Sequence, residues 1–417
     1  MLMEQRSISV VHILTSLKGG AAVAASSLNV GLIDQGIHSK LLVNSKRESE
    51  IETRTADNLY TADTFDRLKS KSLTVIQQSI VQSTKDLITT FGISRISDSE
   101  LLEIDSIIHI HSAYNFIKTS QIQELANHGK QIVIHLHDQR FITGGCHHDR
   151  GCREFLRECN YCPMVRSPFR KYVIEEKKRI NGLLAQKNIT FVVPSVYLHG
   201  KVREICLRNP NKIRFIPNLP PKGIVRDGAD RTRLRESLGI SENMFVLGFS
   251  AANLDSPYKN FNYFKQVALE LSVIFKNKSI AFRVLVVGAG TTLEIEDKVV
   301  NIGSVNSCRA RELLSAMDLL LVTSSIDNTP NVIIESLLEG TPALGTQVGG
   351  IPELFSHLKN WPYLTGDLSE DISTILSLYK RDISRSDIRD ISLKAFNRDK
   401  IISQYIDLYN SVRDKGI

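Results

Sequence analysis

Acidic side chains flank the predicted start of a helix in the segment SSIDNTPNVIIESLLEG, residues 324–340. Thr329 can cap this helix and Pro330 suits its first position, while the apolar residues that follow predict a buried face. The backbone amides of Asn331 and Val332 would then have no acceptor within the helix. They also carry the positive end of the helix dipole, so this position suits a phosphate group.

The two carboxylates of this segment are Asp327, before the helix, and Glu335, about one turn beyond its start. A carboxylate at Glu335 could accept two hydrogen bonds from a vicinal diol such as a ribose, while the nearby amides hold a diphosphate. The pattern therefore indicates a nucleotide site. A capped surface helix with solvated acids would give the same pattern.

A glycine pair, Gly19 and Gly20 in LKGGAA (17–22), follows a predicted strand and opens a predicted helix. Without side chains at this point, the backbone amides can approach a ligand closely. A tight turn needed only for packing is the alternative interpretation.

A histidine and an acid, His137 and Asp138, end the predicted strand of IHLHDQRFITGG (134–145). Functional side chains collect at strand ends in α/β sheets, so His137 is a candidate for direct contact with a substrate. His135 shares its face of the strand, and a pair of core histidines remains the alternative.

A lysine, Lys259, ends the segment GFSAANLDSPYK (248–259), which again follows a predicted strand. Its ammonium could neutralise a leaving diphosphate. The alternative is a solvated surface lysine.

A cysteine cluster occupies the segment CHHDRGCREFLRECNYC (146–162), which holds four of the six cysteines. Four thiolates in one loop can close a tetrahedral zinc site, and His147 or His148 could replace one of them; reduced, buried thiols are the alternative. A zinc ion here would be structural rather than catalytic. The four candidate ligands are Cys146, Cys152, Cys159 and Cys162.

The elements that must position these residues alternate between short apolar strands and helical segments, with a proline-containing linker at 214–223. This alternation predicts two doubly wound α/β domains. The stretch 45–103 is more polar and is predicted to be helical. The strands are predicted at 8–15, 38–44, 105–112, 131–138, 191–195, 245–251, 282–290, 319–325 and 341–347.

Composition is that of an ordinary globular protein, with 417 residues, 42% hydrophobic and 23% charged. No apolar run reaches the roughly 18 residues of a membrane-spanning helix, and no signal peptide is visible, so a cytoplasmic location is expected. The net charge of +7 suits phosphorylated ligands, nucleic acid or an anionic membrane surface. The basic stretch 165–181 could contact the inner face of the membrane, or form a solvated helix.

The motifs together resemble the retaining glycosyltransferases of family 4, in their bacterial surface-polysaccharide branch (colanic acid, O-antigen or capsule type). The resemblance rests on the glycine turn, HDQRFITGGCHHDRGC with the later CNYCP, VVPS, GFSAANLDSPYKN, VVGAG, and DNTPNVIIESLLEGTPALGTQVGGIPE. It implies the GT-B fold: α/β architecture with two Rossmann-like domains facing a central cleft. The acceptor-side domain would span 1–200 and the donor domain 201–395, with a helix at 396–417 packing back on the first domain.

The resemblance also implies roles for individual residues. Asp327 would meet the transferred sugar, Glu335 the ribose and Lys259 the diphosphate. The amides of Asn331 and Val332 would also hold the diphosphate, and Gly19 and Gly20 would complete that pocket from the first domain. Asn328 would be a further donor-binding residue. His137 would face the reacting sugar. Two positions depart from the common pattern, because Asp327 replaces a glutamate and Asn253 an arginine.

The implied reaction moves a hexosyl group from a nucleotide sugar to a hydroxyl of a saccharide acceptor, lipid-linked in the resembled branch, with retention at the anomeric carbon. It needs no catalytic metal or other cofactor, because Lys259 and helix amides would replace the metal. A sugar-nucleotide 2-epimerase of the same architecture is the alternative enzyme. A non-catalytic RNA-binding or scaffold protein is the alternative of another class, although no RNA motif is visible.

Overall fold

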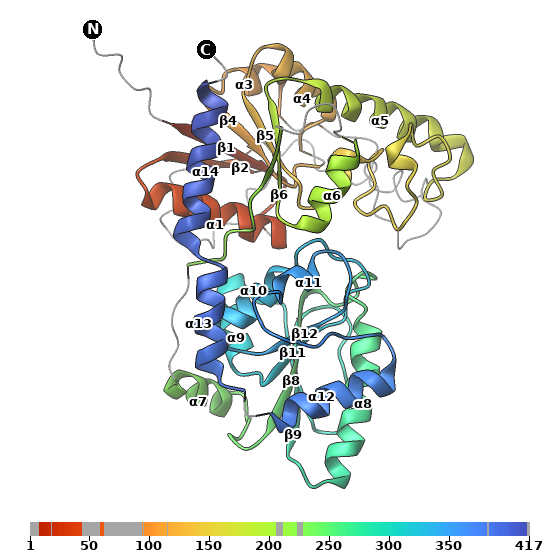
Figure 1. Cartoon of the computed structure of the whole chain (residues 1–417), viewed down its shortest axis with the longest axis vertical. Coiled ribbons are helices and arrows are strands. Elements are labelled where there is room, and N and C mark those ends of the chain that lie inside the picture. The colour runs from red at the N-terminus through yellow and green to blue at the C-terminus, as the bar shows by residue number, and fades with distance from the viewer. Residues whose placement is uncertain are drawn as a thin grey trace. The chain divides into compact units, whose positions relative to one another are not determined.

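The chain folds into two compact units, and each is described by itself (Figure 1). Unit 1 comprises Met1–Leu219 and Asp399–Ile417, and unit 2 comprises Pro220–Arg398. The computed structural model describes residues 8–17, 19–43, 59–61, 94, 96–114, 116–205, 212–222, 228–381 and 383–414.

Unit 1 contains a seven-stranded sheet with the order β3-β2-β1-β4-β5-β6-β7, and every neighbouring pair is parallel. Its central strands are mostly apolar and fully buried because helices cover both faces of a parallel sheet. The strands are β1 (Ser9–Leu14), β2 (His38–Val43), β3 (Leu59–Thr61), β4 (Ile107–Ile110), β5 (Ile132–His135), β6 (Ile189–Val193) and β7 (Ile213–Phe215).

The helices of unit 1 divide between the two faces of its sheet. Buried side chains of α1 and α14 pack on one face, and those of α4, α5 and α6 belong to the cluster on the other. The helices are α1 (Gly20–Asp34), α3 (Asp98–Leu102), α4 (Thr119–Asn127), α5 (Arg170–Ala185), α6 (Val196–Ile205) and α14 (Arg398–Arg413).

Helix α14 follows unit 2 in the sequence but packs in unit 1. Its residues Ile401, Tyr405 and Tyr409 are buried with strand residues such as Val10 and Val133. The first unit continues through β7 to Leu219, so the proline-containing stretch expected to be a linker begins inside unit 1.

Unit 2 contains a five-stranded parallel sheet with the order β10-β9-β8-β11-β12. Helices α8 and α12 cover one face, while α7, α9, α10, α11 and α13 cover the other. The strands are β8 (Phe245–Asn253), β9 (Phe282–Ala289), β10 (Val299–Gly303), β11 (Leu319–Val322) and β12 (Ala343–Gly345). The helices are α7 (Gly228–Ser237), α8 (Phe261–Asn277), α9 (Ser307–Ser315), α10 (Asn331–Leu338), α11 (Ile351–Leu354), α12 (Leu368–Lys380) and α13 (Arg385–Ala395).

All nine predicted strands are present, and the prediction of two doubly wound α/β domains is confirmed. Strands β3, β7 and β10 were not predicted. Strand β3 lies inside the stretch 45–103 that was expected to be helical, so that expectation is wrong at Leu59–Thr61. Helix α3 falls at the end of the same stretch, and residues 45–58 and 62–93 lie outside the described residues.

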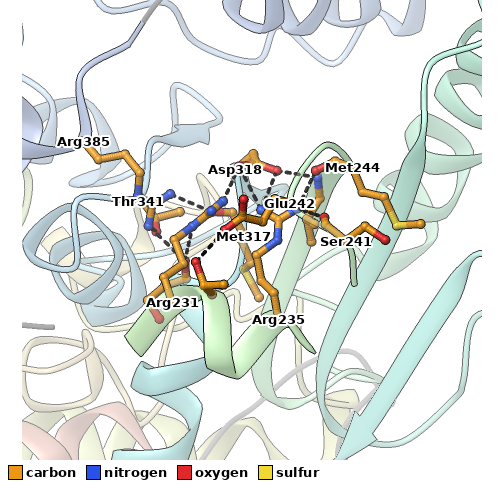
Figure 2. A network of polar contacts seen from close by, with 12 residues as sticks. Arg231, Arg235, Ser241, Glu242, Met244, Met317, Asp318, Thr341 and Arg385 are labelled. Carbon is orange, nitrogen blue, oxygen red and sulfur yellow. Dashed lines mark hydrogen bonds and ion pairs between the residues drawn. The ribbon is translucent and has the colours of Figure 1, made fainter. Parts of the chain in front are cut away.

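A polar network ties the amino ends of the unit 2 strands to α7 and α13 (Figure 2). Asp318, just before β11, accepts hydrogen bonds from the Val246 amide at 2.7 Å and from Arg231 at 2.6 Å. Arg235 is fully buried and donates to both Asp318 oxygens at 3.3 Å. Arg385 donates to the carbonyl oxygens of Met317 and Ser315. These contacts anchor two surface helices to one end of the sheet.

Candidate active site

The strand order of unit 2 reverses between β8 and β11, which are neighbours in the sheet. From β8 the chain continues to β9 and β10 on one side, whereas β11 leads to β12 on the other. In open α/β sheets, ligands bind beyond the carboxyl ends of the strands at this point of reversal. Lys259 follows β8 and Asp327 follows β11, so both candidates lie there.

An ion pair joins these two residues. The Lys259 Nζ lies 2.6 Å from Asp327 Oδ2, and their side chains are 32% and 14% exposed. Ser324 Oγ lies 3.4 Å from the same carboxylate oxygen. The pair is therefore accessible from solvent on the lysine side, and an incoming anion could compete for the ammonium.

The loops that carry the ion pair are fixed to one another by backbone acceptors. Thr323 Oγ1 donates to the carbonyl oxygens of Lys259 and Asn260, at 3.0 Å each. The Ser325 amide donates to the carbonyl oxygen of Tyr258 at 2.8 Å. The loop after β8 thus keeps its place beside the loop after β11.

A third loop, which follows β12, closes on the backbone of Asp327. Gly349 has a φ of +57°, and a Cβ there would lie 1.6 Å from the Asp327 carbonyl oxygen. The Gly350 amide donates to that carbonyl at 3.3 Å. Only glycine permits both the left-handed backbone and this close approach.

Helix α10 begins at Asn331, one residue later than predicted, because Pro330 is the N-cap. Neither Pro330 nor Thr329 caps the helix through a side chain, and Thr329 Oγ1 is buried without a hydrogen-bond partner. The expected Thr329 cap is therefore wrong. Asn331 and Val332 nevertheless form the first turn, at the positive end of the helix dipole.

Glu335 is half-buried on α10, beside a second charged pair. Desolvation raises the pKa of Glu335 to about 7; Arg311 lowers it and Glu339 raises it. Arg311 Nε lies 3.5 Å from Glu339 Oε1, so the guanidinium is shared between two acids. This carboxyl changes its charge near neutral pH.

Two asparagines of unit 2, Asn328 and Asn253, differ from each other in exposure. Asn328 is buried, at 3% exposed, so its side chain is not a surface group ready for a ligand. Asn253, at the end of β8, accepts a hydrogen bond from the Asp255 amide at 3.0 Å and is exposed. It therefore caps a turn in the described structure.

In unit 1, the predicted glycine turn lies at the start of α1. Gly19 is the N-cap with a φ of +90°, and a Cβ there would meet nothing within 4 Å. The glycine thus serves the backbone conformation rather than close packing. Gly20 is the first helical residue, so the two glycines present the α1 amino terminus beyond the end of β1.

His137 lies two residues beyond β5 and is half-buried, with Nε2 at 2.9 Å from His111 Nδ1. Burial lowers the pKa of His137 to about 4, although the neighbouring Asp138 raises it. Asp138 itself contacts His147 Nδ1 at 2.6 Å. Burial raises the pKa of Asp138, but His147 and the Arg140 amide more than offset this and lower it to about 2.

The four cysteines of the predicted zinc site gather around one small cavity of ≈ 10 Å³, which is also lined by Phe155 and Met164. Burial raises the pKa of Cys159 to about 11 and that of Cys146 further, so these thiols keep their protons. Within the described part of the chain, the sets of three metal-ligating atoms closer than 4.8 Å consist of histidines. The zinc site at Cys146, Cys152, Cys159 and Cys162 therefore stays a prediction.

The basic stretch 165–181 forms most of α5, but it is less basic at its surface than the sequence indicates. Lys177 is buried and donates to the Ile142 carbonyl oxygen at 3.0 Å. Arg179 pairs with Glu175 and Glu176 on the same helix. The apolar residues Val173 and Ile180 of this stretch are part of the interior. In the described ranges, no helix has the length and apolar character needed to cross a bilayer.

Sequence reasoning missed three residues that shape the unit 2 site: Thr323, Arg311 and Gly349. Thr323 and Arg311 carried no local signal, because their partners are distant in sequence. The glycine pair that includes Gly349 was visible in QVGGIPE, and its position after a predicted strand could have indicated a loop closing on the site.

The chain is similar to known proteins in sequence and in fold. Residues 239–381 match the family Glycosyl transferases group 1. N-acetyl-alpha-D-glucosaminyl L-malate synthase of Bacillus anthracis is 29% identical over 200 residues, which cover 44% of this chain and 50% of that protein. The chain thus spans about half the length of that relative.

Solved structures resemble the chain over nearly its whole length. Anabaena HepE in complex with UDP-glucose has a TM-score of 0.63 at 16% identity, covering 97% of this chain and 100% of that chain. Sucrose-phosphate synthase from Thermosynechococcus elongatus has a TM-score of 0.67 at 14% identity, with 98% and 100% covered. WaaG, a glycosyltransferase involved in lipopolysaccharide biosynthesis, has a TM-score of 0.63 at 13% identity, with 97% and 99% covered. The chain has the GT-B fold.

Proposed function

We propose that the protein is a retaining, metal-independent glycosyltransferase that moves a hexosyl group from a nucleotide sugar to a hydroxyl of a saccharide acceptor. The observation that carries the proposal is the Lys259–Asp327 pair, at 2.6 Å, at the point where the strand order of unit 2 reverses. The match of residues 239–381 to glycosyl transferases group 1 supports it independently.

In this proposal, donor binding breaks the Lys259–Asp327 ion pair, and the diphosphate replaces Asp327 as the partner of Lys259. The diphosphate takes the Lys259 ammonium, helped by the amides of the first turn of α10 at Asn331 and Val332. Asp327 is then released to accept hydrogen bonds from hydroxyls of the sugar. Glu335 accepts from the ribose hydroxyls, one turn further along α10.

The proposed reaction breaks one bond and forms one bond at the anomeric carbon. The bond from the anomeric carbon to the diphosphate oxygen breaks, the acceptor oxygen bonds to the same face, and the acceptor proton passes to the leaving diphosphate. Lys259 stabilises the negative charge that develops on that diphosphate. The protein therefore acts through positioning and charge, and needs no general base.

The donor is proposed to be a UDP-hexose. HepE, one of the structures that the chain resembles, was solved with UDP-glucose. From unit 1, we propose that Gly19, Gly20 and His137 contact the donor. Asn328 of unit 2 would contact the donor through its backbone, since its side chain is buried.

Two acceptors are candidates. A lipid-linked saccharide in cell-surface polysaccharide synthesis follows from the motif resemblance, and the name of WaaG is in keeping with it. A small hydroxy acid is the second, because the Bacillus anthracis relative is named for the glycosylation of malate. A contact with the inner membrane would favour the first, through the exposed Arg166, Lys171 and Lys178 of the basic stretch.

A panel of nucleotide sugars tests the proposal, with thermal stabilisation and release of the nucleoside diphosphate as readouts. One UDP-hexose is expected to stabilise the protein and to be hydrolysed slowly without an acceptor. Adding saccharide or hydroxy-acid acceptors should then give an α-linked product from an α-linked donor. A 2-epimerised sugar as the main product would instead identify the alternative enzyme, and no stabilisation by any donor would refute the proposal.

A further inference from the structure

A row of histidines lies under helices α1 and α14 in unit 1. Neighbouring rings contact one another from β1 through β4 to β5, and their centroids are 4.1 to 5.8 Å apart. Four of them are buried, at 0–2% exposed, and His137 is half-buried. The five are His12, His109, His111, His135 and His137.

Three of these rings belong to a continuous chain of hydrogen bonds that begins on α1 and ends at His137. Ser39 Oγ donates to Asn29 Oδ1 at 2.7 Å, and it lies 3.2 Å from His12 Nε2. His12 Nδ1 lies 3.0 Å from His111 Nε2. His111 Nδ1 lies 2.9 Å from His137 Nε2.

The first bond of the chain determines the direction of the rest. Because the single hydroxyl hydrogen of Ser39 goes to Asn29, the Ser39 oxygen must accept from His12 Nε2–H. A neutral His12 then has a bare Nδ1, which accepts from His111 Nε2–H. In the same way, His111 Nδ1 accepts from His137 Nε2–H.

The rings of the chain are held neutral. Burial lowers the pKa of His12 to about 3, and burial followed by the neighbouring histidines lowers that of His111 well below its usual value. Burial likewise lowers the pKa of His137 to about 4. Each ring therefore carries one proton at neutral pH, and each can donate at only one nitrogen.

We infer that the chain Asn29–Ser39–His12–His111 positions His137 as a single tautomer, with Nε2 protonated and Nδ1 as a hydrogen-bond acceptor. This inference rests on the proposed function only in the identity of the group that Nδ1 accepts from, which is a hydroxyl of the sugar substrate. His137 in this state accepts a hydrogen bond and does not supply a proton. Ser39, His12 and His111 are positioning residues, since they act through His137.

The histidine row also offers a competing arrangement. Ring nitrogens of His111, His135 and His137 lie within 4.8 Å of one another, a separation that a transition-metal ion could bridge. An ion bound at the facing nitrogens, His111 Nδ1 and His137 Nε2, would replace the ring proton between them. The tautomer chain and a metal at these nitrogens thus exclude each other.

Imidazole ¹⁵N NMR on the full chain, in the absence of substrate, distinguishes the two. At pH 7 we expect His137 to be protonated at Nε2 and bare at Nδ1, and to remain so when Zn²⁺ is added at one equivalent. A His137 protonated at Nδ1 would overturn the inference. So would ring shifts of His111 and His137 to metal-bound values at that Zn²⁺ concentration.

Variants of Ser39 give a second measurement that does not alter a histidine. Ser39→Ala removes the acceptor for His12 Nε2–H and is expected to mix the tautomers of His137, lowering kcat about 10-fold or more with UDP affinity unchanged. Ser39→Thr keeps the hydroxyl and should restore both readouts. Ser9→Ala is the matched control, because Ser9 on β1 also contacts a histidine, His38, but lies outside the chain. An unchanged His137 spectrum in Ser39→Ala would contradict the inference.

The NMR result is independent of catalysis, so the two proposals can fail separately. The predicted tautomer in a protein without nucleotide-sugar activity would refute only the proposed function. An active enzyme with the opposite tautomer would refute only the role of the chain.

Discussion

Each end of the unit 2 sheet holds an aspartate that is paired with cationic side chains, but the two aspartates differ in how many partners the protein gives them. At the amino ends, Asp318 is surrounded by Arg231, Arg235 and a backbone amide, and Arg385 nearby donates to carbonyl oxygens (Figure 2). At the carboxyl ends, Asp327 faces one lysine whose side chain is a third exposed.

The difference lies in what remains for a ligand. Around Asp318 the arginines donate to the carboxylate and to carbonyl oxygens of the protein itself, so the network fixes helices α7 and α13 to the sheet. Around Asp327 the ammonium has an exposed side, and the amino terminus of α10 begins four residues later. We therefore expect substitutions at the first end to change stability and substitutions at the second to change activity.

Replacing Lys259 should have the largest effect. Lys259→Ala removes the charge proposed to stabilise the diphosphate, which costs about 2–4 kcal/mol in the transition state, or roughly 30- to 1,000-fold in kcat. Thermal stability should change little, because only one partly exposed pair is lost. Lys276→Ala, which breaks the exposed pair with Glu296, is the matched control. Near wild-type turnover in Lys259→Ala would show that Lys259 does not stabilise the diphosphate.

Asp318→Asn should produce the reverse result. It leaves the buried Arg235 without its carboxylate, so we expect the free energy of unfolding in urea to fall by about 2–3 kcal/mol. Donor affinity, measured on the folded protein, should stay unchanged. Asp230→Asn, in an exposed pair with Arg233, serves as the control and should lose less than about 1 kcal/mol. Equal losses in the two variants would show that the network is not stabilising.

Gly349→Ala tests whether the loop after β12 controls the position of Asp327. The new Cβ would displace the Asp327 carbonyl, so we expect about a 10-fold fall in turnover. Gly239→Ala separates this effect from backbone strain, since Gly239 also has a positive φ, +67°, but its Cβ would meet nothing within 4 Å. If both variants lose stability alike and neither loses turnover, the close approach has no role in the site.

The smallest effect concerns Glu335 and pH. Because burial raises its pKa to about 7, the carboxyl loses its proton around neutrality, and donor affinity should increase roughly 3- to 10-fold from pH 6 to pH 8. Glu335→Gln should bind donor more weakly at pH 8 and lack this dependence. Isothermal titration with UDP measures both proteins, and a parallel pH dependence in the variant would assign the titration to another group.

Stability should follow the same group with the opposite sign. A carboxyl whose pKa is higher in the folded state stabilises the protein fully below its unfolded pKa, near 4.5, and that contribution is lost as the pH rises through about 7. Glu335→Gln should therefore gain stability relative to wild type between pH 5 and pH 8. Thermal melts at the two pH values check the sign.

Much of the architecture could be predicted because the strands are continuous apolar runs, as burial on both faces of a sheet requires. Strand β10, with the half-exposed sequence VVNIG, lies at a sheet edge and gave a weaker signal. Strand β7 was hidden in a proline-containing stretch. Periodicity detects burial, so edge strands with one exposed side escape it.

The candidate site likewise contains residues that the sequence could predict and residues that it could not. The positions of Lys259 and Asp327 were predictable because each follows a strand, and the structure brings the two side chains together at 2.6 Å. Their roles at the site stay predictions. The Thr329 cap failed because Pro330 already ends the extended segment, which leaves the threonine hydroxyl buried. The continuous hydrogen bonding of His12 and His111 with His137 depends on the register of neighbouring strands, such as His12 opposite His109. Such a register cannot be obtained from one strand alone.

The position of α14 has a consequence for how the protein is made. Tyr409 contacts His109 at 2.8 Å and Tyr405 contacts His135, so the histidine face of unit 1 is covered by residues translated after the whole of unit 2. At ordinary rates of synthesis this delay is roughly 10–40 s. During that interval unit 2 can fold, while one face of the unit 1 sheet is not yet covered by α14. We expect a chaperone to bind this exposed apolar surface.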